Sequence, residues 1–301
     1  MPELLTQFAP LNAVLSMVER VALSESPVLI TGERGTGKTL LARAIHAASR
    51  RPGPLVEIDT PALPPELLDV ELFGFDEDGG PRKPGGLEHA AQGTLLLDEI
   101  AAMGHTSQTK LVNAMSRAML PTPDGAGRIP ISARVIATTA HPLNVLVRDG
   151  RFSEPLYDRI RNAHVELPPL RERRPDIALL AQQLAAQFGG LRTPRLSPEA
   201  IAVLEEYSWP GNVRELRTVM ERAITAANGG EVLPRQLAAL LSPSPEAGAP
   251  MRLADLERRH IEAVLRQTNW HRGRAALLLG ISNKTLYRKI REYGFTPPAS
   301  D

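Results

Sequence analysis

The chain has 301 residues, of which 43% are hydrophobic, an ordinary fraction for a soluble protein with enough length for two or three domains. It contains no cysteine, which excludes disulfide bonds, thiol chemistry and cysteine-ligated zinc. It also lacks a long uncharged apolar run and an N-terminal basic-then-apolar leader, so we expect a cytoplasmic protein with no membrane partner.

The net charge of +1 is unevenly distributed. Residues 251–301 contain ten basic and five acidic residues, a net +5, which leaves −4 for the rest of the chain. A basic end on a mildly acidic body suggests a nucleic-acid-binding module, although ordinary surface charge explains the asymmetry equally well.

Apolar periodicity predicts alternating strands and helices over the first half of the chain. Apolar residues at helical spacing predict a first helix over residues 11–23. The predicted strands cover residues 27–31, 55–59, 93–99, 133–138 and 162–167, and the helices between them cover 40–46, 65–73 and 106–120. Segments 75–86 and 121–130 are expected to be loops. This alternation predicts an α/β fold, with helices on both faces of a parallel sheet.

From Pro175 onward the pattern is wholly helical. Helices are predicted over 176–188, from Ser197 as an N-cap, over 211–227 and over 233–241. The Ser- and Pro-rich segment that follows has the composition of a linker. We therefore divide the chain into an α/β domain (1–173), a helical domain (174–241), a linker (242–251) and a C-terminal domain (252–301).

The segment from Gly32 to Thr39 matches the phosphate-binding pattern G-x-x-x-x-G-K-[ST] and lies between a predicted strand and a predicted helix. Glycines let the backbone N–H groups wrap a polyphosphate, and the helix N-terminus adds positive charge. Lys38 is expected to reach the β- and γ-phosphates of ATP, and the Thr39 hydroxyl to bind Mg²⁺. The alternative is a glycine-rich turn with a chance lysine. The predicted nucleotide-binding residues of this segment are Gly32, Glu33, Arg34, Gly35, Thr36, Gly37, Lys38, Thr39 and Leu40.

Two adjacent carboxylates, Asp98 and Glu99, end the apolar strand Leu95-Leu96-Leu97. Asp98 is a second predicted Mg²⁺ ligand, and Glu99 is expected to orient or deprotonate the attacking water. Many strands end in a solvated acid, so the pair is informative only because it follows the phosphate-binding pattern.

Three short helices are predicted at the C-terminal end, over 253–268, 272–280 and 283–293, with Gly280 in the turn and Ser282 as the last N-cap. This is helix-turn-helix spacing, with Leu286 and Ile290 facing the core. The alternative is a basic three-helix bundle that binds protein. The residues predicted to contact double-stranded DNA are Ser282, Asn283, Lys284, Thr285, Tyr287, Arg288, Lys289 and Arg291.

Further strings make a resemblance specific: residues 71–74 (ELFG), 93–100, 167–173 (LPPLRER), 209–216 (WPGNVREL) and 284–289 (KTLYRK). The chain resembles, over nearly its whole length, bacterial enhancer-binding proteins, the NtrC-type activators of sigma-54 RNA polymerase. The resemblance implies an AAA+ ATP-binding domain with an α-helical lid and a C-terminal Fis-type helix-turn-helix domain. It also implies a two-fold DNA site, contact with RNA polymerase holoenzyme, and self-association as a dimer, with a hexamer left open.

The resemblance also assigns roles to two arginines. Arg214 aligns with the sensor II arginine that contacts nucleotide from the lid, and Arg159 aligns with an arginine finger for a neighbouring subunit's γ-phosphate. A planar, permanently charged guanidinium suits both roles. Without the resemblance, a surface salt bridge is the better interpretation of either residue.

The chain departs from the family pattern at the loop between Gly74 and the next strand, which is short and lacks the sigma-54-contacting string GAFTGA. The family's sensor asparagine is replaced by Ala140, a second arginine by Ser153 and a switch asparagine by Asp59. We therefore expect ATP binding but not sigma-54 remodelling. Slow ATP hydrolysis, and a nucleotide-gated regulator that acts with another sigma factor without turnover, both remain open.

No receiver or ligand-sensing domain is recognisable in the sequence. Either the protein has none, or the chain is part of a longer protein. A replication or repair ATPase would share the phosphate-binding pattern but not the Fis-like strings.

Overall fold

The computed structural model describes most of the chain. It describes Thr6, Phe8, and residues 18–75, 82–121, 128–189, 194–241, 257–258, 260–262, 264–265, 268, 270–293 and 295. The chain forms two compact units, Met1–Ser242 and Pro243–Asp301. Residues 242–251, which were predicted as a linker, lie outside the described residues, as do residues 11–17 of the predicted first helix.

The first unit is built on a five-stranded parallel sheet with strand order β2-β3-β6-β1-β7. The strands are β1 Val28–Thr31, β2 Leu55–Asp59, β3 Thr94–Asp98, β6 Arg134–Thr139 and β7 Ala163–Glu166. All five strands were predicted, so the α/β fold class is confirmed. Because β1 is paired with both β6 and β7, the loop that follows β1 starts from an interior strand and not from an edge of the sheet.

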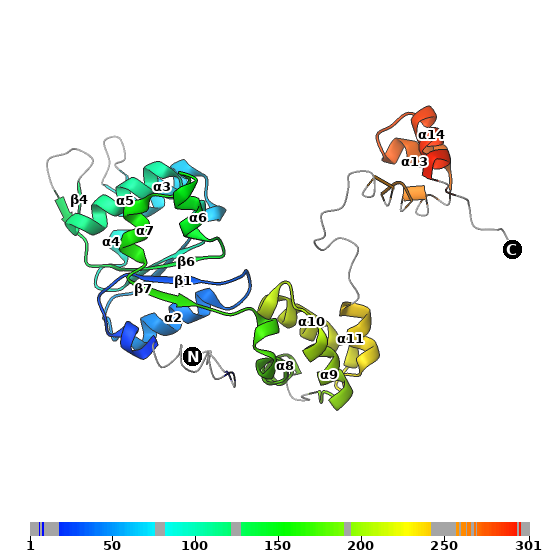
Figure 1. Cartoon of the computed structure of the whole chain (residues 1–301), viewed down its shortest axis with the longest axis horizontal. Coiled ribbons are helices and arrows are strands. Elements are labelled where there is room, and N and C mark those ends of the chain that lie inside the picture. Colours follow the sequence, from blue (N-terminus) through cyan, green and yellow to red (C-terminus); the bar gives the residue numbers. More distant parts are fainter. Residues whose placement is uncertain are drawn as a thin grey trace. The chain divides into compact units, whose positions relative to one another are not determined.

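Side chains of the central strands alternate between two hydrophobic cores, as a pleated strand requires. Leu95 and Leu97 belong to one core, whereas Leu96 belongs to the other. Residues 18–22 and helix α2 (Lys38–Ala48) cover one face. The other face carries α3 Pro65–Phe73, α4 Gly86–His89, α5 His105–Arg117, α6 Leu143–Arg148 and α7 Glu154–Ile160 (Figure 1).

Several elements differ from the sequence prediction. Helix α5 ends at Arg117 rather than residue 120, because Ala118 adopts a left-handed conformation with φ 51°. A small antiparallel strand pair, β4 Met119–Pro121 and β5 Arg128–Pro130, overlaps the predicted loop 121–130. Three short helices, α4, α6 and α7, were not predicted, and short 3₁₀ turns occur at Thr60–Ala62, Ile100–Ala102 and Leu170–Glu172.

The helical part of the first unit has a core of its own around the fully buried Trp209. It comprises α8 Arg174–Gly189, α9 Pro198–Glu206, α10 Asn212–Ala227 and α11 Pro234–Leu241. The predicted N-cap of α9 is confirmed, since the Ala200 N–H donates to Ser197 Oγ at 3.1 Å. Among the helices that the structure describes, none combines the length and apolarity that crossing a membrane requires.

The second unit contains α13 Arg272–Leu278 and α14 Asn283–Tyr293, preceded by helical residues within 257–265. Gly280 makes the predicted turn with φ 65°, and the Thr285 N–H donates to Ser282 Oγ at 3.1 Å. Leu286 is buried against the preceding helices and Ile290 packs on the same core, as predicted. The helix-turn-helix arrangement is therefore confirmed.

A buried arginine joins the sheet to the helix at residues 18–22. Arg134, the first residue of β6, is 2% exposed. Its guanidinium donates to the carbonyl oxygens of Val21 (2.6 Å), Ala22 (2.8 Å) and Ser26 (3.0 Å). It thus adds donors to carbonyl groups at and just after the end of this helix, where the Val21 carbonyl also accepts from the Ser24 N–H at 3.1 Å.

We predict that Arg134→Met lowers the free energy of unfolding by about 2–4 kcal/mol, because buried carbonyls lose charge-assisted donors. Denaturant titration followed by circular dichroism measures the change. Arg43→Met is the matched control: Arg43 pairs with Glu57 at the surface, and its loss should cost less than about 1 kcal/mol. Equal costs for the two variants would contradict the structural role of Arg134.

Candidate nucleotide-binding site

The loop between β1 and α2 has the backbone that a phosphate-binding loop needs. Gly32, Gly35 and Gly37 all have positive φ, at 149°, 79° and 106°. A Cβ at Gly35 would lie 2.3 Å from the carbonyl oxygen of Gly211, and one at Gly32 would lie 2.6 Å from that of Leu167. Glycine is therefore required at both positions, by conformation and by close backbone approach.

Lys38, the first residue of α2, points its ammonium back into the loop. Its Nζ donates to the carbonyl oxygens of Gly32 (2.9 Å) and Glu33 (3.1 Å) and lies 3.2 Å from Glu99 Oε1. The side chain is 6% exposed. The structure therefore brings the predicted phosphate-binding lysine and the predicted base together from two different elements.

Asp98 and Thr39 lie side by side at the carboxyl end of the sheet. The Thr39 hydroxyl donates to Asp98 Oδ2 at 3.3 Å, and the Thr138 hydroxyl donates to the other carboxylate oxygen. Hydroxyl and carboxylate oxygens are ligands that Mg²⁺ prefers, so this pair fits the predicted metal.

Glu99 adopts a left-handed conformation with φ 54°, which turns its carboxylate toward the end of β6. Its Oε2 accepts a hydrogen bond from the Ala140 N–H at 3.0 Å. Burial acts to raise the pKa of this carboxyl, but the Ala140 hydrogen bond and the charge of Lys38 outweigh it, so the pKa lies below its usual value. Glu99 is therefore ionised at neutral pH.

Asp59, which replaces the family's switch asparagine, pairs in register with Asp98 across β2 and β3. The neighbouring Thr60 hydroxyl donates to the backbone oxygens of Asp98 (3.0 Å) and Glu99 (2.6 Å). The aspartate at the switch position is therefore the direct cross-strand neighbour of Asp98.

The helical lid docks directly on the phosphate loop through Asn212. This residue is fully buried and adopts φ 54°. Its side-chain amide donates to Glu33 Oε2 (3.1 Å) and the Arg34 carbonyl (3.0 Å), and its oxygen accepts from the Leu170 N–H (2.7 Å). Sequence analysis did not identify this role of Asn212, whose side-chain partners lie 42, 179 and 178 residues away in the chain.

Two arginines complete the docking of the lid on the phosphate loop: Arg171 in the Leu170–Glu172 turn, and Arg173 directly after it. Arg171 makes a two-pronged contact with Glu33, at 2.9 and 2.7 Å. The hydrogen bonds from Arg171, and then from Asn212, hold the pKa of Glu33 below its usual value. Arg173 is buried and donates to the Thr36 carbonyl at 2.8 Å.

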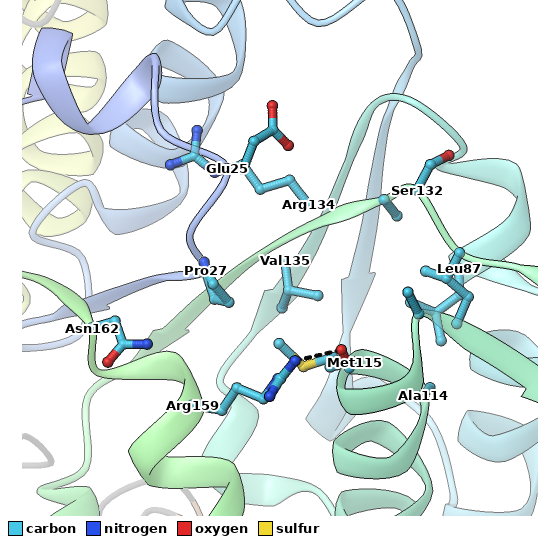
Figure 2. Close-up of a pocket in the computed structure, with 13 residues that line it drawn as sticks. Glu25, Pro27, Leu87, Ala114, Met115, Ser132, Arg134, Val135, Arg159 and Asn162 are labelled. Carbon is cyan, nitrogen blue, oxygen red and sulfur yellow. Dashed lines mark hydrogen bonds between the residues drawn. The ribbon is translucent and has the colours of Figure 1, made fainter.

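The two arginines singled out by resemblance lie in different places. Arg214 is exposed in the first turn of α10, and its Cβ is 3.1 Å from where a Cβ on Gly35 would lie. Arg159 instead lines a cavity of about 410 Å³ at the amino end of the sheet, where its Nη2 donates to the Met115 carbonyl at 2.6 Å (Figure 2). Arg159 is thus not brought to the phosphate loop of its own chain.

In the second unit most of the predicted DNA-contacting residues are exposed. These are Ser282, Asn283, Lys284, Tyr287, Arg288 and Arg291, with Thr285 half-buried beside the cap. Lys289 differs: its ammonium contacts Glu257 at 2.7 Å and the Tyr293 hydroxyl at 3.3 Å, with 15% of the side chain exposed. Its charge is partnered within the unit, and the contact of Lys289 with DNA stays a prediction.

The strand order, the phosphate-binding loop after the interior strand β1 and the docked helical lid define the class of AAA+ P-loop proteins. Residues 4–166 match the sigma-54 interaction domain, residues 171–252 an AAA+ ATPase lid domain, and residues 252–293 the bacterial regulatory proteins of the Fis family. The chain therefore belongs to the sigma-54 interaction family, and the predicted membership is confirmed.

Named relatives agree with this assignment. The regulatory protein AtoC of Escherichia coli K12 is 38% identical, covering 98% of this chain and 68% of that protein. The nitrogen assimilation regulatory protein NtrX of Azorhizobium caulinodans is 36% identical, covering 92% of this chain and 66% of that protein. A crystal structure of NtrX from Brucella abortus in complex with ATP superposes with TM-score 0.74 at 32% identity, covering 98% of this chain and 70% of that one. The chain thus spans about two thirds of the length of these relatives.

We predict that Asn212→Leu loosens the lid, because it removes the hydrogen bonds to Glu33, Arg34 and Leu170. Hydrogen–deuterium exchange should speed up in peptides covering the phosphate loop and residues 168–171. Asn228→Ala is the control: Asn228 ends the same helix, also in a left-handed conformation, without contacting the loop. The same exchange pattern in both variants would refute the docking role.

Proposed function

We propose that the chain is an ATP-binding AAA+ transcriptional regulator that binds double-stranded DNA through its C-terminal unit. The observation that carries this proposal is the position of Lys38, held inside a glycine loop beside Glu99. The ATP complex of the NtrX relative supports the nucleotide, and the Fis-family match supports DNA. A cytoplasmic location remains a prediction.

In the proposed site each group has a distinct task. Loop N–H groups and Lys38 bind the phosphates, and Arg214 approaches from the lid. Thr39 and Asp98 would hold Mg²⁺, which, when bound, neutralises phosphate charge. Glu99 accepts the proton of the attacking water. We assign Arg159 to a neighbouring subunit's γ-phosphate, a role that requires self-association beyond the DNA-bound dimer, with a hexamer as the larger form.

We predict that Lys38→Ala abolishes measurable ATP binding in titration calorimetry while the helical content stays unchanged. The ammonium is the group expected to reach the β- and γ-phosphates. Arg159→Ala is the control, since it should bind ATP with unaltered affinity and lose only turnover. Unaltered affinity in Lys38→Ala would show that the site is misassigned.

The second unit is proposed to bind DNA with α14 in the major groove. We predict that Arg288→Ala flattens the slope of log affinity against log salt by about one for a random-sequence duplex, since it removes one phosphate contact. Lys289→Ala should change the slope less, because its ammonium contacts Glu257. Arg222→Ala, an exposed arginine in the first unit, is the control. A slope that is unaltered in Arg288→Ala would place this residue away from the DNA.

The loop that replaces GAFTGA is closed tightly at its base. Phe75 and Lys83 form a two-hydrogen-bond bridge at 3.1 and 2.9 Å, and Arg82 makes a two-pronged contact with Glu88 at 2.7 and 2.6 Å. Residues 76–81 lie outside the described residues. They contain Asp76, Glu77 and Asp78 with glycine and proline, a composition that offers little apolar area for gripping a partner.

We therefore propose that the protein does not remodel sigma-54 polymerase and acts instead with housekeeping-sigma holoenzyme, with ATP tuning its assembly and DNA affinity. The loss of the sensor asparagine at Ala140 supports the same proposal. The rival is a loop that still binds sigma-54 through its charges, and the family match favours that rival.

In vitro transcription separates the two proposals. Purified protein and ATP are combined with either holoenzyme on a template that carries the protein's binding site. We predict a change in transcription with the housekeeping holoenzyme only. Robust ATP-dependent open complexes with sigma-54 holoenzyme would establish the rival.

A further inference from the structure

The two oxygens of the Glu99 carboxylate contact different groups. Oε1 lies 3.2 Å from Lys38 Nζ. Oε2 accepts the Ala140 N–H at 3.0 Å and lies 3.5 Å from His141 Nδ1. Within the part of the chain that the structure describes, Lys38 and His141 are the charged or titratable side chains in ion-pair contact with this carboxylate.

His141 is held in place by its own backbone and faces the phosphate loop. Its N–H donates to Thr139 Oγ1 at 3.0 Å, which fixes the turn after β6. The imidazole is half exposed and lines a cavity of about 510 Å³ together with Gly32 and Glu33. The ring therefore stands between Glu99 and the space next to the loop.

We propose that His141 is a positioning residue that anchors Oε2 of Glu99, so that Oε1 is presented to the attacking water when ATP is bound. This inference rests on the proposed function, in which Lys38 binds the phosphates. It assigns separate roles to the two oxygens of one carboxylate.

A second anchor on Glu99 is needed because Lys38 has two roles: its ammonium contacts Glu99, and in the proposed function it also binds the phosphates. Its ammonium contacts Oε1 in the structure, and in the proposed site the phosphates draw the same ammonium toward the loop, which leaves that oxygen uncovered. A carboxylate held by the Ala140 N–H alone would still rotate about its own bonds. The His141 ring adds a second contact on Oε2, with Nδ1 at 3.5 Å, the outer limit of hydrogen-bond distance. A neutral ring with its proton on Nδ1 can donate to Oε2 once the two atoms move closer.

In the proposed step, Oε1 takes a proton from water while the water oxygen bonds to the γ-phosphorus. The bond from that phosphorus to the bridging oxygen breaks, and the electron pair leaves with ADP. In this proposal His141 acts only through Glu99, so its substitution should lower kcat without changing ATP affinity.

The test compares four versions of the 301-residue chain: wild type, His141→Leu, His141→Asn and His164→Leu. Asn keeps an N–H donor close to the place of Nδ1, whereas Leu keeps only bulk. His164 lines the same cavity but contacts Thr31, and so serves as the control. ATP affinity is measured by calorimetry, and kcat and KM by steady-state phosphate release.

We expect His141→Leu to lower kcat by about tenfold or more, up to the roughly 10²–10⁴-fold that a positioned base contributes in total, with ATP affinity within about twofold of wild type. His141→Asn should regain most of kcat, and His164→Leu should match wild type. The proposal is overturned by unaltered kcat in His141→Leu, by failure of Asn to rescue, or by a wild type that binds ATP without turnover. A wild type that binds no ATP overturns the proposed function itself, and the role of His141 with it.

Discussion

The close approach of the lid to the phosphate loop is the constraint on which the first unit depends. Gly211 and Gly35 come together at a distance that leaves no room for a Cβ, and the Val213 N–H donates to the Gly35 carbonyl at 3.0 Å. Asn212 then ties the same loop to the Leu170 turn. Because these hydrogen bonds join the loop to the first residues of α10, a change of loop conformation would displace α10.

The same loop binds its own lysine through backbone carbonyl groups. Lys38 is partnered by two carbonyl oxygens and by Glu99, so a buried cation is never left uncompensated. A bound polyphosphate takes over the ammonium and releases these groups. Phosphate binding would therefore exchange the partners of one ammonium group. Among the groups that would lose their contact with Lys38 is Glu99, the proposed base.

The sequence predicted elements whose signal is local. Strands β1, β3 and β6 contain continuous apolar runs, and the phosphate-binding loop is fixed by its glycines and by Lys38. It did not predict α6 and α7, which are short and rich in β-branched or proline residues, nor the pair β4–β5, whose partners are separated by a loop. The role of Asn212 and the contact of Lys289 with Glu257 depend on residues distant in the chain, so no local pattern could reveal them.

One consequence follows from the place of Arg159. Its guanidinium is tethered to the carboxyl-terminal end of α5 through the Met115 carbonyl. If that arginine serves a neighbouring subunit, association must first break an intrachain bond and leave a helix-end carbonyl without its donor. Subunit contact would then be sensed inside α5, on the far side of the sheet from helix α2, so that assembly itself becomes a signal within each subunit.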